Sequence, residues 1–169
     1  MSGTKNFKSL QDFSRGKKKK SRIAAALSIT ALALALAALS AAAIAFFYSR
    51  GELLCYGDAA AHVNIARRIV DSRTPGWEQV GTVWLPLPHL IMIPFVRNDW
   101  MWQTGLAGAI PSGLCFVLGG VFVFLAARRV FASGSAAVAA CLLLALNPNL
   151  LYLQSVPMTE ALFLAALAA

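Results

Sequence analysis

The chain has 169 residues, of which 59% are hydrophobic and only 13% are charged, and its net charge is +8. This balance excludes an ordinary soluble domain of the same length and indicates that lipid is the solvent for much of the chain. Three cysteines without a C-x-x-C pair and two histidines give no sign of a disulfide framework or a zinc site. The sequence therefore predicts no cofactor and no metal.

The first predicted element is a basic segment over residues 1–22, in which eight lysines and arginines stand against one aspartate. The segment is polar and has no periodic apolar residues, so we expect it to be disordered. Because its lysine run lies next to an apolar stretch, it is typical of a cytoplasmic topology signal that contacts anionic lipid. Nucleic acid is not an expected partner.

A membrane helix is predicted over residues 23–48, where 26 residues contain no charge, no proline and no glycine. At about 1.5 Å per residue, this stretch crosses a hydrocarbon core of roughly 30 Å with some tilt. A cleaved signal peptide is the alternative, but the apolar run is about twice as long as a usual signal. We therefore expect a multi-pass protein of the plasma (inner) membrane with a cytoplasmic N-terminus.

Further helices are predicted over residues 105–127 and 131–147, and a fourth begins in residues 161–169. Arg128 and Arg129 end the second helix, and such residues favour the cytoplasmic side of a membrane. The predicted fold class is therefore all-α, a polytopic membrane protein with about three spans and the start of a fourth.

This topology places the loops 49–103 and 148–160 on the same extracytoplasmic side. The longer loop is expected to hold juxtamembrane helices. Within it, the apolar segment Trp84–Val96 is short and contains three prolines, so it suits an interfacial or re-entrant element and not a regular span.

The segment Asp58–Asp71 of the longer loop is predicted to form an amphipathic helix. Asp58 and His62 fall on its apolar arc beside Ile65 and Ile69, a position that is costly for a charge without a use. A carboxylate there suits a general base, since partial burial raises its pKa, and His62 suits a hydrogen-bond neighbour or substrate contact. The alternatives are an Asp58 that caps the helix and a His62 that only packs.

Other polar residues also allow two interpretations. Arg67 and Arg68 are able to clamp a phosphate through their planar guanidinium groups, or they pair with Asp71 or with lipid headgroups. Glu160 follows Thr159 at the predicted start of the last helix, where helix capping explains an acidic residue, but a glutamate at a membrane edge also suits a functional site.

Three sequence blocks resemble the N-terminal part of bacterial membrane glycosyltransferases of the C-type (GT-C) fold, relatives of the protein O-mannosyltransferases. The blocks are Tyr56–Gly76, Gly81–Phe95 and Asn147–Glu160, and the resemblance runs from about Ile23 to Ala169. It implies a polytopic enzyme that takes a sugar from a polyprenyl-phosphate carrier. The acceptor would be a lipid, glycan or protein on the extracytoplasmic face.

The resemblance also implies roles for individual residues. Asp58 matches the acidic residue early in a juxtamembrane helix and would be the acceptor-activating base, while Glu160 matches an acidic residue before the fourth helix that shapes the same cavity. Many relatives have a second acidic residue here, but Ala59 and Ala60 follow Asp58, which gives no support for a metal-binding carboxylate pair. The other candidate substrate contacts are His62, Arg67, Arg68, Trp84 and His89.

Members of this family have many more than four membrane helices. The resemblance therefore implies that this chain is a fragment or a truncated reading frame and is inactive by itself. The alternative function is a non-catalytic membrane subunit or transporter fragment with a re-entrant Trp84–Phe95 segment, although the mid-helix charges typical of transporters are absent from the sequence.

Overall fold

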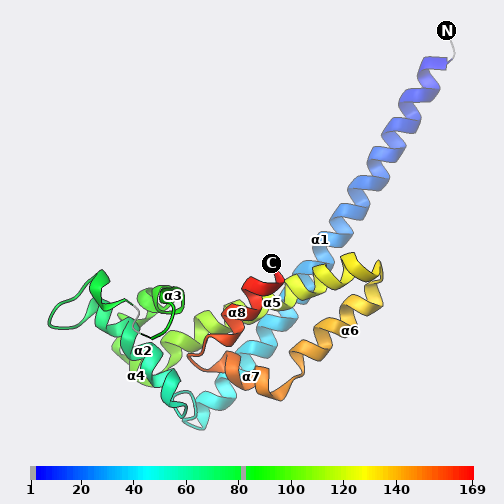
Figure 1. Cartoon of the computed structure of the whole chain (residues 1–169). Helices are drawn as coiled ribbons and strands as arrows, with labels where there is room; N and C mark the ends of the chain where they lie inside the picture. Colours follow the sequence, from blue (N-terminus) through cyan, green and yellow to red (C-terminus); the bar gives the residue numbers. More distant parts are fainter. Residues whose placement is uncertain (1–2, 81–82) are drawn as a thin grey trace.

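The structure is a computed structural model that describes residues 3–80 and 83–169, with side chains from residue 26 onward. The first two residues of the predicted block Gly81–Phe95 therefore lie outside the described residues. The side chains of the basic segment also lie outside the described part. The described residues form helices without any strand, as the sequence predicts (Figure 1). In chain order the helices are α1 Gly3–Ser49, α2 Gly57–Val70, η1 Trp77–Gln79, α3 Pro86–Val96, α4 Asp99–Thr104, α5 Leu106–Phe131, α6 Gly134–Ala145, α7 Pro148–Ser155 and α8 Glu160–Ala168.

Two helices in the described part of the chain are long and apolar enough to cross a membrane, Ala26–Ser49 of α1 and Leu106–Phe131. They indicate a membrane protein. In α5, half of the most apolar 18-residue stretch is buried inside the protein. In α1, only 11% of the corresponding 18-residue stretch is buried. Helix α5 is therefore the centre of the bundle, and α1 is a peripheral helix with most of its surface open to lipid.

Helix α1 differs from the prediction at its N-terminal end, because the helix begins at Gly3 where a disordered tail is expected. Lysine, arginine and glutamine are good helix formers, and the basic segment extends a helix that is already nucleated by the apolar stretch. In Figure 1 this part of α1 projects away from the other helices.

The third predicted span is also different. Helix α6 has 12 residues, and at 1.5 Å per residue it is only about 18 Å long, too short to cross a bilayer by itself. It ends at Ala145, and Asn147 then caps α7 by accepting hydrogen bonds from the amides of Asn149 at 3.0 Å and Leu150 at 3.2 Å. Most of the predicted loop 148–160 is therefore helical.

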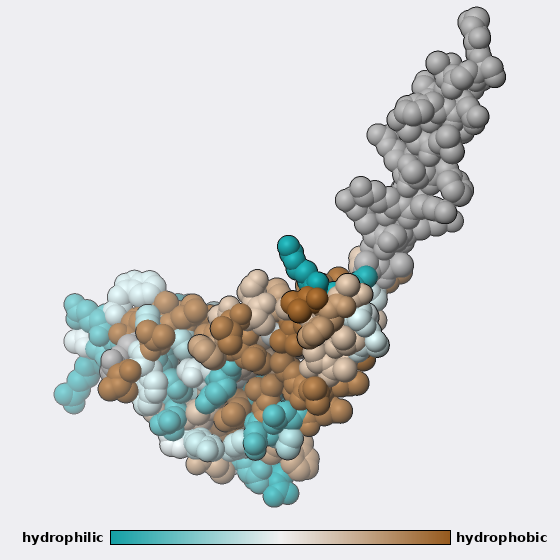
Figure 2. Space-filling view, turned by 45° about the vertical axis from the view of Figure 1, so that its right-hand side comes forward, coloured by the Kyte–Doolittle hydropathy of each residue, from teal (hydrophilic) through white to brown (hydrophobic). Residues whose placement is uncertain are grey.

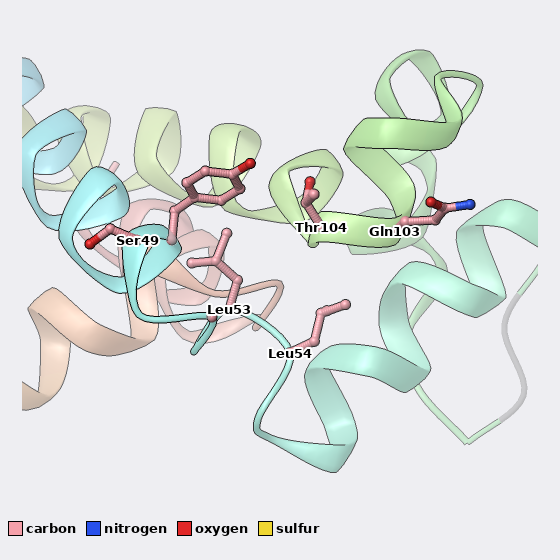
Figure 3. A pocket seen from close by; sticks show the side chains of 7 residues that line it. Ser49, Leu53, Leu54, Gln103 and Thr104 are labelled. Carbon is pink, nitrogen blue, oxygen red and sulfur yellow. The ribbon is translucent and has the colours of Figure 1, made fainter.

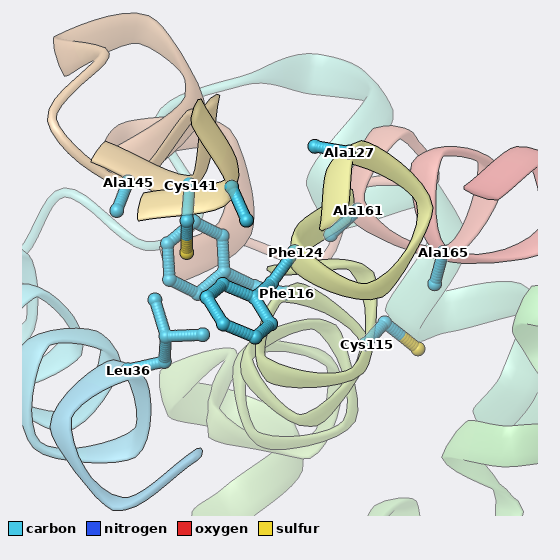
Figure 4. Close-up of a cluster of buried hydrophobic side chains, with 10 residues drawn as sticks. Leu36, Cys115, Phe116, Phe124, Ala127, Cys141, Ala145, Ala161 and Ala165 are labelled. Atoms are coloured by element: carbon cyan, nitrogen blue, oxygen red, sulfur yellow. The ribbon is translucent and has the colours of Figure 1, made fainter. Parts of the chain in front are cut away.

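The main core surrounds α5, which packs against α1, α6 and α8 (Figure 4). Phe116 is fully buried, and Leu36 of α1, Cys141 of α6 and Ala165 of α8 belong to the same cluster. Small residues on α5 allow this close approach, as is common between membrane helices. A Cβ atom on Gly113, for example, would lie 2.6 Å from Ser40 Oγ of α1.

A buried polar contact joins α1 to α7 within this bundle. Ser40 Oγ donates to Gln154 Oε1 at 2.6 Å, and Gln154 Nε2 donates to Ser155 Oγ at 2.7 Å. Farther along, Tyr152 Oη donates to the carbonyl of Glu52 at 3.3 Å. Helix α7 thus lies beside the end of α1, so the segments after α1 and after α6 lie at the same end of the molecule.

The surface divides into two kinds. Figure 2 shows mainly hydrophobic residues over the right-hand part of the visible bundle, whereas hydrophilic residues lie among them on the left and along the bottom. Large apolar side chains of α5 and α6, including Leu114, Leu118 and Leu143, are exposed in the isolated chain. Such exposure is what a lipid-facing surface requires.

A second, smaller core joins α2, α3 and the start of α5. Its buried residues are Val63, Ala66, Met92, Val96 and Ala107. Gly105 connects α4 to α5 with a φ angle of +82°, a conformation that favours glycine. This core fixes α2 and α3 side by side, and it positions the polar residues described next.

Candidate functional site

Asp58 lies in the first turn of α2 and is exposed to solvent. The prediction of a water-poor position is therefore wrong in this chain, because the first turn of α2 packs through Ala59 and leaves Asp58 on its open side. The capping alternative is also not observed, since Tyr56 is the N-cap residue and no side chain caps the helix. As an acidic residue in the first turn, Asp58 still stabilises the positive end of the helix dipole.

His62 and His89 form the centre of the site. His62 Nδ1 lies 2.9 Å from His89 Nε2, a hydrogen bond that connects α2 to α3. Both side chains are buried, with His62 1% and His89 0% exposed. The neighbour predicted for His62 was Asp58 or a substrate, so this pairing is a correction. It arises because the apolar faces of α2 and α3 bring together the only two histidines of the chain.

Burial keeps this pair uncharged at neutral pH. It lowers the pKa of His62, although the nearby carboxylates of Asp58 and Glu160 oppose part of this shift. Burial also lowers the pKa of His89 to about 4, and the charges of His62 and Arg68 act in the same direction. Each ring therefore carries a single proton, and one of these protons makes the bond between them.

Trp84 and Glu160 lie close to the pair. The indole of Trp84 stands 4.7 Å from the His62 ring, measured between centroids. Glu160 is the first residue of α8, and its Oε2 atom is buried without a hydrogen-bond partner. An unpaired buried carboxylate oxygen costs free energy, so it marks a place where a donor from a ligand or water is missing.

An apolar cavity of about 290 Å³ opens beside these residues. It lies between the start of α3, with Trp84 and Pro88, and the start of α8, with Thr159 and Phe163. The cavity therefore adjoins both the histidine pair, through Trp84, and the carboxylate of Glu160, through Thr159.

Another pocket, of about 450 Å³, lies between the end of α1 and α4 (Figure 3). Ser49, Leu53, Leu54 and Thr104 line it, and Tyr48 is its only titratable residue. Its lining has no carboxylate, histidine or lysine that could act as a base on the hydroxyl groups of Ser49 and Thr104, so it is not the candidate site.

Arg67 has a structural environment. Its Nη1 donates to the carbonyl of Val96 at 2.6 Å, and its Nη2 lies 2.8 Å from Asp99 Oδ1. Its Nε donates to Asp71 at 3.0 Å, and the guanidinium stands 4.9 Å from the Trp102 ring centroid. The carboxylates of Asp71 and Asp99 raise the pKa of Arg67. Of the two predicted interpretations, pairing with Asp71 is therefore the one that the structure contains.

We expect Arg67→Met to lower the free energy of unfolding of the α2–α3 unit by about 1–3 kcal/mol. The two carboxylates are largely exposed and contribute little, so most of the loss comes from the unsatisfied Val96 carbonyl and the lost contact with Trp102. Hydrogen exchange of the α2 and α3 amides in detergent micelles measures the effect. The matched control is the exposed neighbour Arg68→Met, with a change within about 0.5 kcal/mol. Equal effects would contradict this role for Arg67.

The described residues offer no group of three or more histidine, cysteine, aspartate or glutamate side chains that suits a metal ion. His62 and His89 also direct a nitrogen at each other, which leaves each ring one nitrogen for any further partner. The arrangement therefore fits acid–base chemistry and polar recognition at the edge of an apolar cavity.

Sequence reasoning named most of these residues but missed several of their contacts. It identified neither the bond between the histidines nor Asp99 and the Val96 carbonyl as partners of Arg67. It also missed the bond from Trp102 Nε1 to Asn64 Oδ1, which is 3.0 Å long. A usable signal was present for the histidines alone, because the only two in the chain both lie in apolar helical segments.

Comparisons with models of protein families, with curated proteins and with solved structures find no match for this chain. The part of the chain that the structure describes is all-helical, with two helices that are long and apolar enough to cross a membrane, and it holds a buried histidine pair near the carboxylates of Asp58 and Glu160.

Proposed function

We propose that this chain is the N-terminal module of a membrane glycosyltransferase. The enzyme transfers a sugar from a polyprenyl-phosphate carrier to a lipid, glycan or protein acceptor on the extracytoplasmic face. The proposal rests on the resemblance of three sequence blocks to the GT-C glycosyltransferases, and the spatial arrangement of those blocks supports it.

The observation that carries the proposal is the convergence of the three blocks. The first contributes Asp58 and His62, the second contributes Trp84 and His89, and the third ends at Glu160. His62 contacts Trp84 and His89, which belong to the second block. It also lies within electrostatic range of Glu160, which is almost 100 positions later in the chain. Segments that are distant in sequence but meet around acids, bases and a cavity are expected of an active site.

In the proposed reaction, Asp58 accepts the proton of an acceptor hydroxyl. The hydroxyl oxygen bonds to the anomeric carbon of the sugar, the bond from this carbon to the phosphate oxygen breaks, and polyprenyl phosphate leaves. An exposed Asp58 is accessible to an acceptor from the aqueous side. Apolar surface next to the site, at Trp84 and Phe163, suits a lipid-linked donor.

Asp58→Asn tests this proposal, because asparagine keeps the shape of the side chain but cannot accept the proton. Membranes that carry the protein at its natural length are supplied with a radiolabelled polyprenyl-phosphate sugar, and transfer is expected to fall at least 100-fold, as for loss of a general base. The matched control is Glu78→Gln, an exposed acidic residue in the same loop, with transfer unchanged.

Labelling of the exposed Cys55 with a membrane-impermeant maleimide checks insertion and orientation in the same samples. Labelling from the extracytoplasmic side at equal level in wild type and variant is expected. Near-normal transfer by the Asp58 variant would contradict its role. Absence of transfer by the unaltered protein would favour a non-catalytic membrane subunit.

A further inference from the structure

The bond between His62 and His89 allows two arrangements of protons. In one, His62 Nδ1 carries the shared proton and donates it to His89, which leaves His62 Nε2 bare. In the other, His89 Nε2 donates, so His62 carries its own proton on Nε2 and His89 Nδ1 is bare. The heavy-atom positions alone are the same in both arrangements.

The charges around the pair differ between its two ends. The groups that act on His62 are the carboxylates of Asp58, one turn earlier on α2, and Glu160 at the start of α8. The group that acts on His89, besides His62, is the guanidinium of Arg68. Negative charge therefore acts on His62, and positive charge acts on His89.

The surroundings of His89 favour the second arrangement. His89 Nδ1 is buried without a hydrogen-bond partner, and the positive charge of Arg68 acts on this ring. A buried N–H group without an acceptor is rarer in proteins than an acceptor atom without a donor, and a lone pair is favoured over an N–H group beside a positive charge. A bare Nδ1 places the proton of His89 on Nε2, so His89 is the donor to His62.

We propose that His89 is a positioning residue, which donates its Nε2–H to His62 Nδ1 and thereby fixes the tautomer in which His62 carries its own proton on Nε2. A base oriented by a third group is a recurring device in enzymes. The role in sugar transfer rests on the proposed function, but the tautomer itself does not.

Nuclear magnetic resonance of the 169-residue chain with ¹⁵N-labelled histidine, in detergent micelles at pH 7, tests the proposal. The expected spectrum shows His62 protonated on Nε2 and bare on Nδ1, and a scalar coupling between His62 Nδ1 and His89 Nε2 with the proton on His89. A His62 that is protonated on Nδ1 would overturn the assignment. Because this readout needs no sugar transfer, its failure is distinct from failure of the proposed activity.

Two variants of His89 separate positioning from packing. His89→Gln keeps an N–H donor at the place of Nε2, and we expect His62 to keep its tautomer. His89→Leu keeps an apolar side chain but removes the donor, and we expect both tautomers of His62 to become populated. If the leucine variant unfolds, the glutamine variant still decides the question, since a changed His62 tautomer there would contradict the proposal.

Discussion

Gly108→Ala is expected to destabilise the bundle by about 1–3 kcal/mol, as overpacking of a close contact does. A Cβ atom at this position of α5 would lie 2.3 Å from Pro157 Cβ and 2.8 Å from Pro157 Cα. Because the second of these atoms belongs to the backbone, the conflict cannot be relieved by a side-chain rotation. The segment before α8 must move, and Glu160 moves with it.

Thermal unfolding in detergent micelles, followed by circular dichroism, measures this loss as a fall of several degrees in the midpoint. The matched control is Gly134→Ala at the start of α6, where an added Cβ meets nothing within 4 Å. Alanine also has the better helix propensity, so this control is expected to be neutral or slightly stabilising. An equal loss in both variants would show that the Gly108 contact with Pro157 does not hold α8 in place.

The helices that the sequence predicted well are those fixed by long runs without charge. The apolar stretch 105–127 is found within α5, which continues to Phe131 because Arg128 and Arg129 favour a helix C-terminus. The prolines of Trp84–Val96 argued against a regular span, and α3 is a helix of 11 residues, too short to cross a bilayer, in which Pro86 occupies the first turn, where its missing N–H costs nothing.

The site was less predictable, because it depends on how helices pack. Helical periodicity correctly placed Ile65 and Ile69 on a buried face. It could not show that the first turn of α2 is covered on the side of Ala59 and open on the side of Asp58. Nor could it show that His62 would meet His89, 27 positions away, since that contact depends on the crossing of two helices and on the core around Met92.

Acid is expected to destabilise the α2–α3 unit as the pH falls from about 6.5 toward 4. In the folded protein the pKa of His89 is lowered from 6.5 to about 4, so the unfolded chain binds a proton more tightly than the folded one. The stabilisation is therefore complete above about pH 6.5 and is lost as the pH falls toward 4. The shift corresponds to about 3 kcal/mol, and the lowered pKa of His62 acts in the same direction.

Tryptophan fluorescence is a suitable probe, because all four tryptophans lie between Trp77 and Trp102, in or beside this unit. Denaturant unfolding in micelles at pH 7, 6, 5 and 4 should show a steep loss of stability in the wild type. In His89→Gln the amide does not titrate, so the loss is expected to be about 3 kcal/mol smaller over the same range. An identical pH dependence in both proteins would mean that His89 is not held uncharged by its burial. The proton balance of the pair, and with it the fixed tautomer of His62, would then need another explanation.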